Sequence, residues 1–406
     1  MKKHQLILAA AFLGSILTAS AALNIPSDGS DGALNITEDT VIDLSKAVTG
    51  TWNQNNSANA GKGVYDPEKW AIVFKYSSVN VAGVSNGSPP FSTPAKVTFI
   101  NHSNRAPVVW LVQGNVTIDG TVSVAGGKWT NDVVGRLTPS QPGPGGFRGG
   151  ARGPSGVGAG YGPGGGTANG NGYYGTVYGN PQIIPLIGGS GSGAVDPYWG
   201  PGNGASGGGA ILIAAGGTVS INGLIDANGG NSPSDGQYFG NSSGGAVRII
   251  GEHVTGAGEI RAICATTPNY GRIRIETANP LSASIRTFPE TIGVPPANPP
   301  IIWPAANAPK ARVISVDAQP APADPSSPLI ASADVAIQNN APVNILIETR
   351  DFPIEGVVQL FIIPKFAGRT TLVATRINGD INLATWSVTT TLPNGFVTLQ
   401  ARATQP

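Results

Sequence analysis

The chain repeats one sequence unit, and this repeat restricts its fold more than any other feature. Residues 116–127 (VTIDGTVSVAGG) return as residues 219–230 (VSINGLIDANGG) and, more weakly, as residues 254–262 (VTGAGEIRA). Each copy is preceded by a short apolar run; these runs are residues 108–112, 210–214 and 246–250. Self-similarity of this kind is typical of an architecture that stacks one structural unit on the next.

The spacing of the copies predicts a right-handed parallel β-helix interrupted by an insertion. Val254 follows Val219 by 35 residues, whereas Val219 follows Val116 by 103. The excess of 68 residues matches a Gly-rich tract at about 142–209. In a coil of parallel strands, alternate side chains point inward. The expected inward residues are Val116, Ile118, Val122 and Val124 in one copy, and Val219, Ile221, Leu224 and Ile225 in the next.

The last quarter of the chain has a different pattern. Prolines are frequent in residues 289–309, which predicts a semi-rigid linker after a β-helix domain of residues 23–288. Seven short β-type runs then recur at the spacing of an immunoglobulin-like sandwich, so residues 310–406 are expected to form one, with Trp386 in its core. These runs are residues 312–316, 333–337, 343–347, 357–363, 370–374, 384–390 and 397–401.

The first 22 residues predict export. A basic start precedes an apolar run at residues 6–17 and a small-residue stretch, which together form a secretory signal peptide. The apolar run is too short for a spanning helix, which needs ~20 residues, so we expect no transmembrane segment after cleavage. Without Lys2 and Lys3 the chain has 22 basic and 23 acidic residues. This balance gives no reason to expect nucleic-acid binding and is compatible with a secreted or cell-surface protein.

Few residues in the repeat region suggest catalysis. Lyases and glycosidases built on β-helices need acidic side chains that converge on one face. Here Asp119 aligns with Asn222, and Asp226 aligns with Ser123, so no acidic column repeats. His102 and His253 are too few for a histidine metal cluster, and Cys264 is expected to be a buried small side chain. We therefore predict no catalytic residue, no metal and no cofactor.

The Gly-rich tract contains the candidate ligand-binding residues. Its charges are Arg148, Arg152 and Asp196, and aromatic residues punctuate it. The candidates are Tyr161, Tyr173, Tyr174, Tyr178, Tyr198 and Trp199. Their rings could stack on sugar rings or on a neighbouring subunit. Alternatively, they pack onto the solenoid and hold the insertion in place, since Gly supplies no side chain for that purpose.

Several segments resemble those of secreted, Gly-rich β-helix surface proteins of environmental bacteria. They are residues 27–32, 105–112, 116–127, 207–214 and 271–275. The C-terminal part resembles immunoglobulin-like modules of exported bacterial proteins. The resemblance concerns architecture and transfers no catalytic assignment. The repeat architecture and the predicted export favour a non-enzymatic structural or adhesive protein that binds polysaccharide or matrix components through exposed aromatics and Asn/Ser rows. The alternatives are a self-assembling filament or matrix subunit, and a polysaccharide lyase or glycoside hydrolase on the same scaffold.

Overall fold

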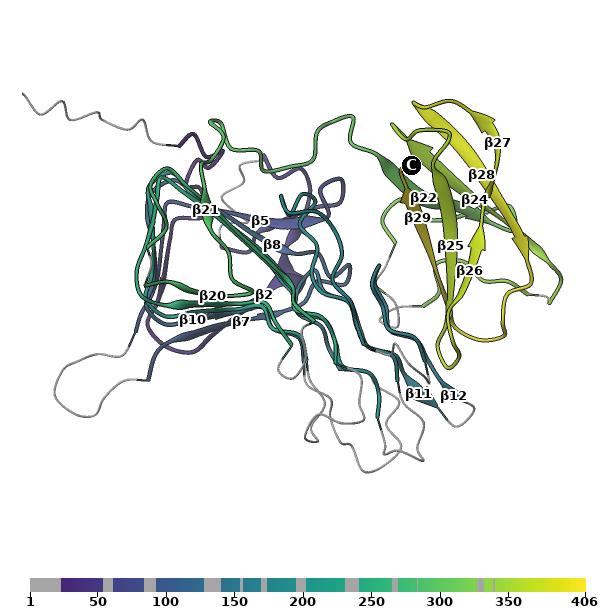
Figure 1. Cartoon of the computed structure of the whole chain (residues 1–406), viewed down its shortest axis with the longest axis horizontal. Coiled ribbons are helices and arrows are strands. Elements are labelled where there is room, and N and C mark those ends of the chain that lie inside the picture. The colour runs from purple at the N-terminus through teal and green to yellow at the C-terminus, as the bar shows by residue number, and fades with distance from the viewer. Residues whose placement is uncertain are drawn as a thin grey trace, which may run out of the picture.

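The structure is a computed structural model in which strands are almost the sole regular element (Figure 1). It describes residues 23–53, 61–83, 93–127, 140–153, 156–168, 174–194, 202–230, 241–264, 269–282, 284–325, 327, 332–338 and 340–406. The predicted signal peptide lies outside these residues. Within them, the only helix is a one-turn 3-10 helix at Leu44–Lys46, so the all-β prediction is confirmed. No helix of the described chain is long and apolar enough to cross a membrane.

Three sheets that surround one core form the N-terminal part of the molecule (Figure 1). The first sheet contains β1 (Ala33–Ile36), β6 (Ser78–Val81), β9 (Val116–Ile118), β14 (Thr218–Ile221) and β17 (His253–Thr255). The second contains β2 (Thr40–Asp43), β7 (Lys96–Ile100), β10 (Thr121–Ser123), β15 (Leu224–Asp226), β18 (Glu259–Arg261) and β20 (Arg286–Phe288). The third contains β3 (Val48–Thr49), β4 (Val64–Asp66), β5 (Ala71–Tyr76), β8 (Val108–Val112), β13 (Ala210–Ala215), β16 (Ala246–Gly251), β19 (Arg272–Thr277) and β21 (Gly293–Val294). From β6 to β19, each pass of the chain adds one strand to each sheet in the same order.

The strand register confirms the alignment of the sequence repeats. Val219 pairs in parallel with both Val116 and Val254. Ile225 likewise pairs with Val122. The predicted inward residues are buried in the core between the sheets, with one exception. Leu224 points outward, because it pairs with Thr121 and its neighbour Ile225 takes the inward position.

The Gly-rich tract leaves the coil between β10 and β13, and its backbone hydrogen bonds repeat every third residue. The N–H groups of Gly188, Gly191 and Ala194 donate to the carbonyls of Gly145, Tyr161 and Gly158. Those of Gly189 and Ser192 donate to Gly208 and Ala205. A polyproline II helix has three residues per turn and no internal hydrogen bonds. The described residues of the tract, 140–153, 156–168, 174–194 and 202–209, therefore form a bundle of extended segments with the three-residue period of such a helix, called here the glycine bundle.

Glycine is required in this bundle because the backbones approach more closely than a side chain allows. A Cβ on Gly191 would lie 1.8 Å from the carbonyl oxygen of Arg148, and one on Gly207 would lie 1.9 Å from that of Gly189. Collagen uses glycine for the same reason at its crowded axis. Connections of later coils extend the bundle, since the N–H of Gly208 donates to the carbonyl of Ser243.

Two antiparallel sheets form the C-terminal part. One contains β23 (Gln319–Pro320), β22 (Lys310–Val316), β24 (Val343–Arg350), β28 (Leu383–Thr390) and β27 (Thr375–Gly379). The other contains β26 (Thr370–Val373), β25 (Val357–Pro364) and β29 (Val397–Thr404). They share one core, in which Trp386 is buried as predicted and donates through Nε1 to Thr349 Oγ1 at 2.9 Å. The strand predicted at 333–337 is absent from the described residues, although Val335 and Ile337 still pack against this core.

The C-terminal sheets contact the glycine bundle directly, and Figure 1 shows them beside its short hairpin, β11 (Arg152–Gly153) and β12 (Gly156–Val157). Ala159 and Tyr161 form a buried cluster with Phe361 and Ile363. The linker predicted at 289–309 also packs, because Ile302 and Trp303 cover the outer face of the third sheet. The glycine bundle thus contacts the C-terminal sheets on one side and the third sheet on the other.

Candidate functional site

The aromatic residues predicted to bind ligand fall into two groups. Tyr173, Tyr198 and Trp199 lie outside the described residues. Tyr161 is only 3% exposed, and burial raises the pKa of its hydroxyl to about 12. Its ring packs between the glycine bundle and the C-terminal sheets. Tyr161 therefore fills an internal contact in this structure, as the packing alternative expects.

Tyr178 and Tyr174 also contact the protein. The hydroxyl of Tyr178 donates to the carbonyl of Gly188, and its ring meets Phe147 edge-on with 6.4 Å between centroids. The guanidinium of Arg272 lies 5.4 Å from the same ring centroid. Tyr174 is half-buried and has an interaction partner. Among the described candidates, no group of rings forms a shared exposed face.

A row of uncharged polar residues crosses the outer face of the first sheet. Its members are Asn35, Asn80, Thr117, Ser220 and Thr255, one from each strand. Their neighbours along each strand point into the core, so the polar side chains point outward. Parallel pairing spaces them by roughly 4.8 Å. We call this row the polar ladder.

Charged side chains lie beside the polar ladder rather than on its strands, since Asn222 donates both to Ser220 Oγ at 3.4 Å and to the Asp119 carboxylate at 2.7 Å. None of β1, β6, β9, β14 and β17 contains Asp, Glu, Lys or Arg. Asn115 begins a coil beside the ladder, and its Oδ1 accepts a hydrogen bond from the N–H of Thr218 at 2.9 Å. The face therefore offers hydroxyl and amide groups, which donate and accept hydrogen bonds, at the spacing of the coils.

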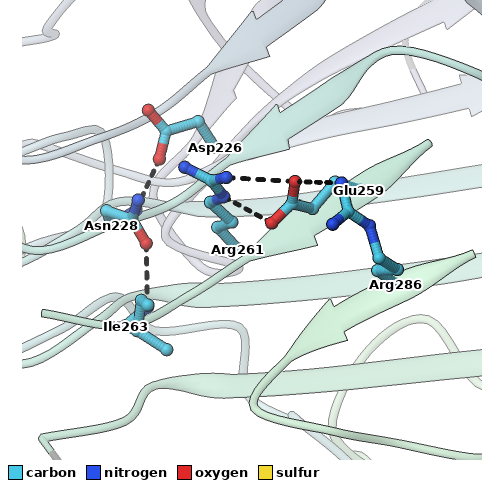
Figure 2. Close-up of polar contacts among 6 residues, drawn as sticks. All are labelled: Asp226, Asn228, Glu259, Arg261, Ile263 and Arg286. Carbon is cyan, nitrogen blue, oxygen red and sulfur yellow. Dashed lines mark hydrogen bonds and ion pairs between the residues drawn. The ribbon is translucent and has the colours of Figure 1, made fainter. Parts of the chain in front are cut away.

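The second sheet carries a contrasting ionic network on its outer face (Figure 2). Glu259 Oε1 accepts from Arg261 Nε at 2.6 Å, and Glu259 Oε2 accepts from Arg286 Nη2 at 3.1 Å. The hydrogen bond from Arg261 lowers the pKa of Glu259, in spite of its partial burial. An ionised carboxylate held by two guanidiniums is a poor proton donor. The network therefore joins the neighbouring strands β18 and β20 and is poorly suited to acid catalysis.

Three further acids of the repeat region are also engaged in local structure. Asp119 accepts a hydrogen bond from Asn222 Nδ2 at 2.7 Å, which places the aligned pair side by side. Glu276 is buried against Arg248 at 2.7 Å. Asp226 caps a turn by accepting from the N–H of Asn228 (Figure 2). Within the described part of the chain, no three His, Cys, Asp or Glu residues gather as a metal site, and Cys264 is buried as predicted.

Comparison with known proteins gives no match to a family model, a curated protein or a solved structure. The polar ladder is a regular row of outward polar side chains, one from each strand of the first sheet. Sequence analysis expected Asn/Ser rows without naming their members. The strand register identifies the members of the row, since Asn80 and Thr117 align only when β6 is paired with β9.

Proposed function

We propose that the protein is an exported, non-enzymatic structural or adhesive protein that binds neutral polysaccharide along the polar ladder. The observation that carries the proposal is the alignment of five uncharged polar side chains on five successive strands. A polysaccharide also presents hydroxyl groups at regular intervals. Single hydrogen bonds in water contribute only about 1 kcal/mol each, so a repeated row gives a binding advantage that one residue lacks.

The scaffold in this proposal is a right-handed parallel β-helix. Support comes from the parallel register of the three sheets, apart from the antiparallel pair β4–β5, and from the fixed order in which the chain adds strands to them. Connections between parallel strands of one sheet are right-handed in the great majority of proteins, because strand twist favours that hand. The C-terminal sheets then act as an immunoglobulin-like module that displays or docks the β-helix at the cell surface or in the matrix.

The test measures retention and cleavage in one experiment. Protein comprising residues 23–406 is passed over an array of immobilised neutral and acidic polysaccharides, and released or unsaturated ends are counted afterwards. We expect retention on a neutral polysaccharide without new ends. The double variant Thr117→Val and Ser220→Val removes two hydroxyls from the ladder and should weaken binding about tenfold.

The control variant for this test is Thr121→Val, on the adjacent outward position of β10 in the second sheet. It removes the same group without touching the ladder and should leave retention unchanged. Equal retention by the ladder variant and the control would contradict the proposed surface. New ends that disappear when Glu259 or Asp226 is replaced would instead support the lyase or hydrolase alternative.

Free strand edges favour a second candidate function, self-assembly into filaments or matrix. Among the described residues, β1 pairs only with β6, and β17 pairs only with β14. Unpaired backbone at a sheet edge can accept a strand from another chain. A sedimentation coefficient that grows with protein concentration would support this function, and a monomer at all concentrations would oppose it.

A further inference from the structure

A partly enclosed cavity lies where the three-sheet part, the glycine bundle and the C-terminal part meet. Its volume is about 170 Å³. Trp70, directly before β5, and Asn104 and Arg105, between β7 and β8, line one side. Phe147, Arg148 and Tyr161 of the glycine bundle line another. Pro325 and Ser327 close the wall from the segment that follows β23.

Two arginines in this wall are buried without a carboxylate partner among the described residues. Arg105 is 3% exposed and Arg148 is 6% exposed. Both donate to one neutral acceptor, Gln141 Oε1, from Arg105 Nη2 at 2.5 Å and from Arg148 Nη2 at 2.9 Å. Nε and Nη1 of Arg105 and Nε of Arg148 find no acceptor. Two positive charges are therefore held close together by an amide that cannot neutralise them.

The third buried arginine of the described residues, Arg248, has a carboxylate partner. Arg248 is 2% exposed, and Glu276 accepts from its Nη2 at 2.7 Å and from its Nε at 2.9 Å. Burying an uncompensated charge is costly, so such pairing is the usual arrangement. Near the cavity, Asp324 does not pair with these arginines in this way. It accepts hydrogen bonds from the Tyr65 hydroxyl and from Asn104 Nδ2.

Electrostatics and backbone conformation both set this wall apart. Burial and the neighbouring Arg148 lower the pKa of Arg105 to about 9, which still leaves it charged at neutral pH. Trp70 and Arg105 have φ values of +46° and +52°. This left-handed region is unfavourable for a residue that carries a side chain. Residues held in such conformations are concentrated at ligand-binding sites, where the surrounding structure fixes them.

We propose that this cavity binds the carboxylate group of a small organic or sugar acid. The guanidinium fork matches a carboxylate, and two guanidiniums without a counter-charge favour an anion over a neutral ligand. The aromatic side chains of Trp70, Phe147 and Tyr161 provide surface for a carbon ring or short chain behind the carboxylate. A cavity of about 150 Å³ accommodates benzene, so the volume suits one ring.

The site is separate from the polar ladder, and the two proposals can fail independently. The acid could be a free small molecule or one uronic acid residue of a polysaccharide, because both present the same group. Isothermal titration of residues 23–406 with benzoate, glucuronate and an oligogalacturonide distinguishes these sources. Tighter binding of benzoate points to a free acid, whereas tighter binding of the oligogalacturonide points to a polymer, and either outcome supports the site.

The principal variant is Arg148→Gln, and its matched control is Arg312→Gln, which makes the same charge change at an exposed position of β22. We expect Arg148→Gln to weaken carboxylate binding at least tenfold, since a charge-assisted contact is lost. The melting temperature of the unliganded variant should stay equal or rise, because the repulsion of Arg105 is removed. A purely structural Arg148 would lower it.

Three results would overturn the inference. They are the absence of saturable binding by any carboxylate, sulfate binding as tight as benzoate binding, and unchanged affinity in Arg148→Gln. If Arg148→Gln does not fold, Arg148→Lys retains the charge but loses the fork. It should still weaken binding by about tenfold, and full affinity in that variant would contradict the proposed recognition.

Discussion

The three-sheet part and the glycine bundle both bury backbone, but the first packs with side chains and the second packs with the backbone itself. In the sheets, inward side chains such as Ile213, Trp110 and Ile249 fill the space between strands and are fully buried. In the bundle, backbone approaches backbone, and positions such as Gly191 leave no room for a Cβ. The sheets are stabilised largely by apolar burial, and the bundle largely by hydrogen bonds in dry surroundings.

This difference predicts how each of the two regions responds to an amino-acid substitution. A packed side-chain core can lose a methyl group and relax partly around the gap. A bundle with backbones in contact cannot gain one, because the carbonyl it would meet is fixed by its own hydrogen bonds. Enlarging a side chain should therefore destabilise the glycine bundle most, whereas shortening one should be the milder change that the three-sheet core tolerates.

The largest effect is expected from Gly191→Ala in the glycine bundle. The new Cβ would lie 1.8 Å from the carbonyl oxygen of Arg148, so two segments of the bundle must separate. We expect the free energy of unfolding, measured by urea denaturation, to fall by about 3 kcal/mol or more. Protease cleavage within residues 140–209 should accelerate at the same time.

The control for this prediction is Gly368→Ala in the C-terminal part. No atom lies within 4 Å of a Cβ at this exposed position. The expected change is within about 0.5 kcal/mol. If the two variants were equally stable, the close approach of backbones in the bundle would be refuted.

A smaller effect is expected from the reverse change in the three-sheet core, Ile213→Val. Ile213 pairs with Trp110 and Ile249 and is fully buried. Removing one methylene should lower the free energy of unfolding by about 1 kcal/mol. The exposed Ile377→Val provides the comparison and should change it little. A loss as large as that of Gly191→Ala would remove the distinction between the two regions.

The sequence was sufficient to predict β-structure and the alignment of the repeats in the three-sheet part, because this signal lies in side chains. Val116, Val219 and Val254 could be aligned by eye, and the strands pair in that register. Leu224 was assigned to the wrong face since it adjoins a second apolar residue, Ile225, and only pairing decides between them. The strand β27 was missed because all five of its residues are exposed and show no alternation.

The glycine bundle and the cavity could not be predicted in the same way. Glycine has no side-chain pattern, and its hydrogen-bond partners are distant, as with Gly143 and Gly207. The cavity joins Trp70, Arg105 and Arg148, which no local motif links. One signal was available, because Arg148 is among the few charges of a Gly-rich tract and an isolated charge there needs an explanation.

The smallest effect concerns pH, where the two regions also differ. The described residues of the glycine bundle contain no acid, whereas Asp28 at the start of the three-sheet part pairs with Lys75 at 2.8 Å. Burial alone would raise the pKa of Asp28, but hydrogen bonds from Lys75 and Ser30 outweigh it and lower the pKa to about 2. Because this value is below the unfolded value of about 3.9, the contribution of Asp28 is complete above pH ~4 and is lost as pH falls through 2.

Asp28 is 43% exposed, so solvent screening limits the loss on acidification to about 1 kcal/mol or less. Urea denaturation at pH 5 and near pH 2 should show this decrease in the wild type and a smaller one in Asp28→Asn, whose amide does not titrate in this range. Other carboxylates, including Glu259, contribute to both proteins and cancel in the difference. An identical decrease in the two proteins would mean that the contact with Lys75 adds nothing to stability, so that the first coil is stabilised by its apolar packing and its other hydrogen bonds.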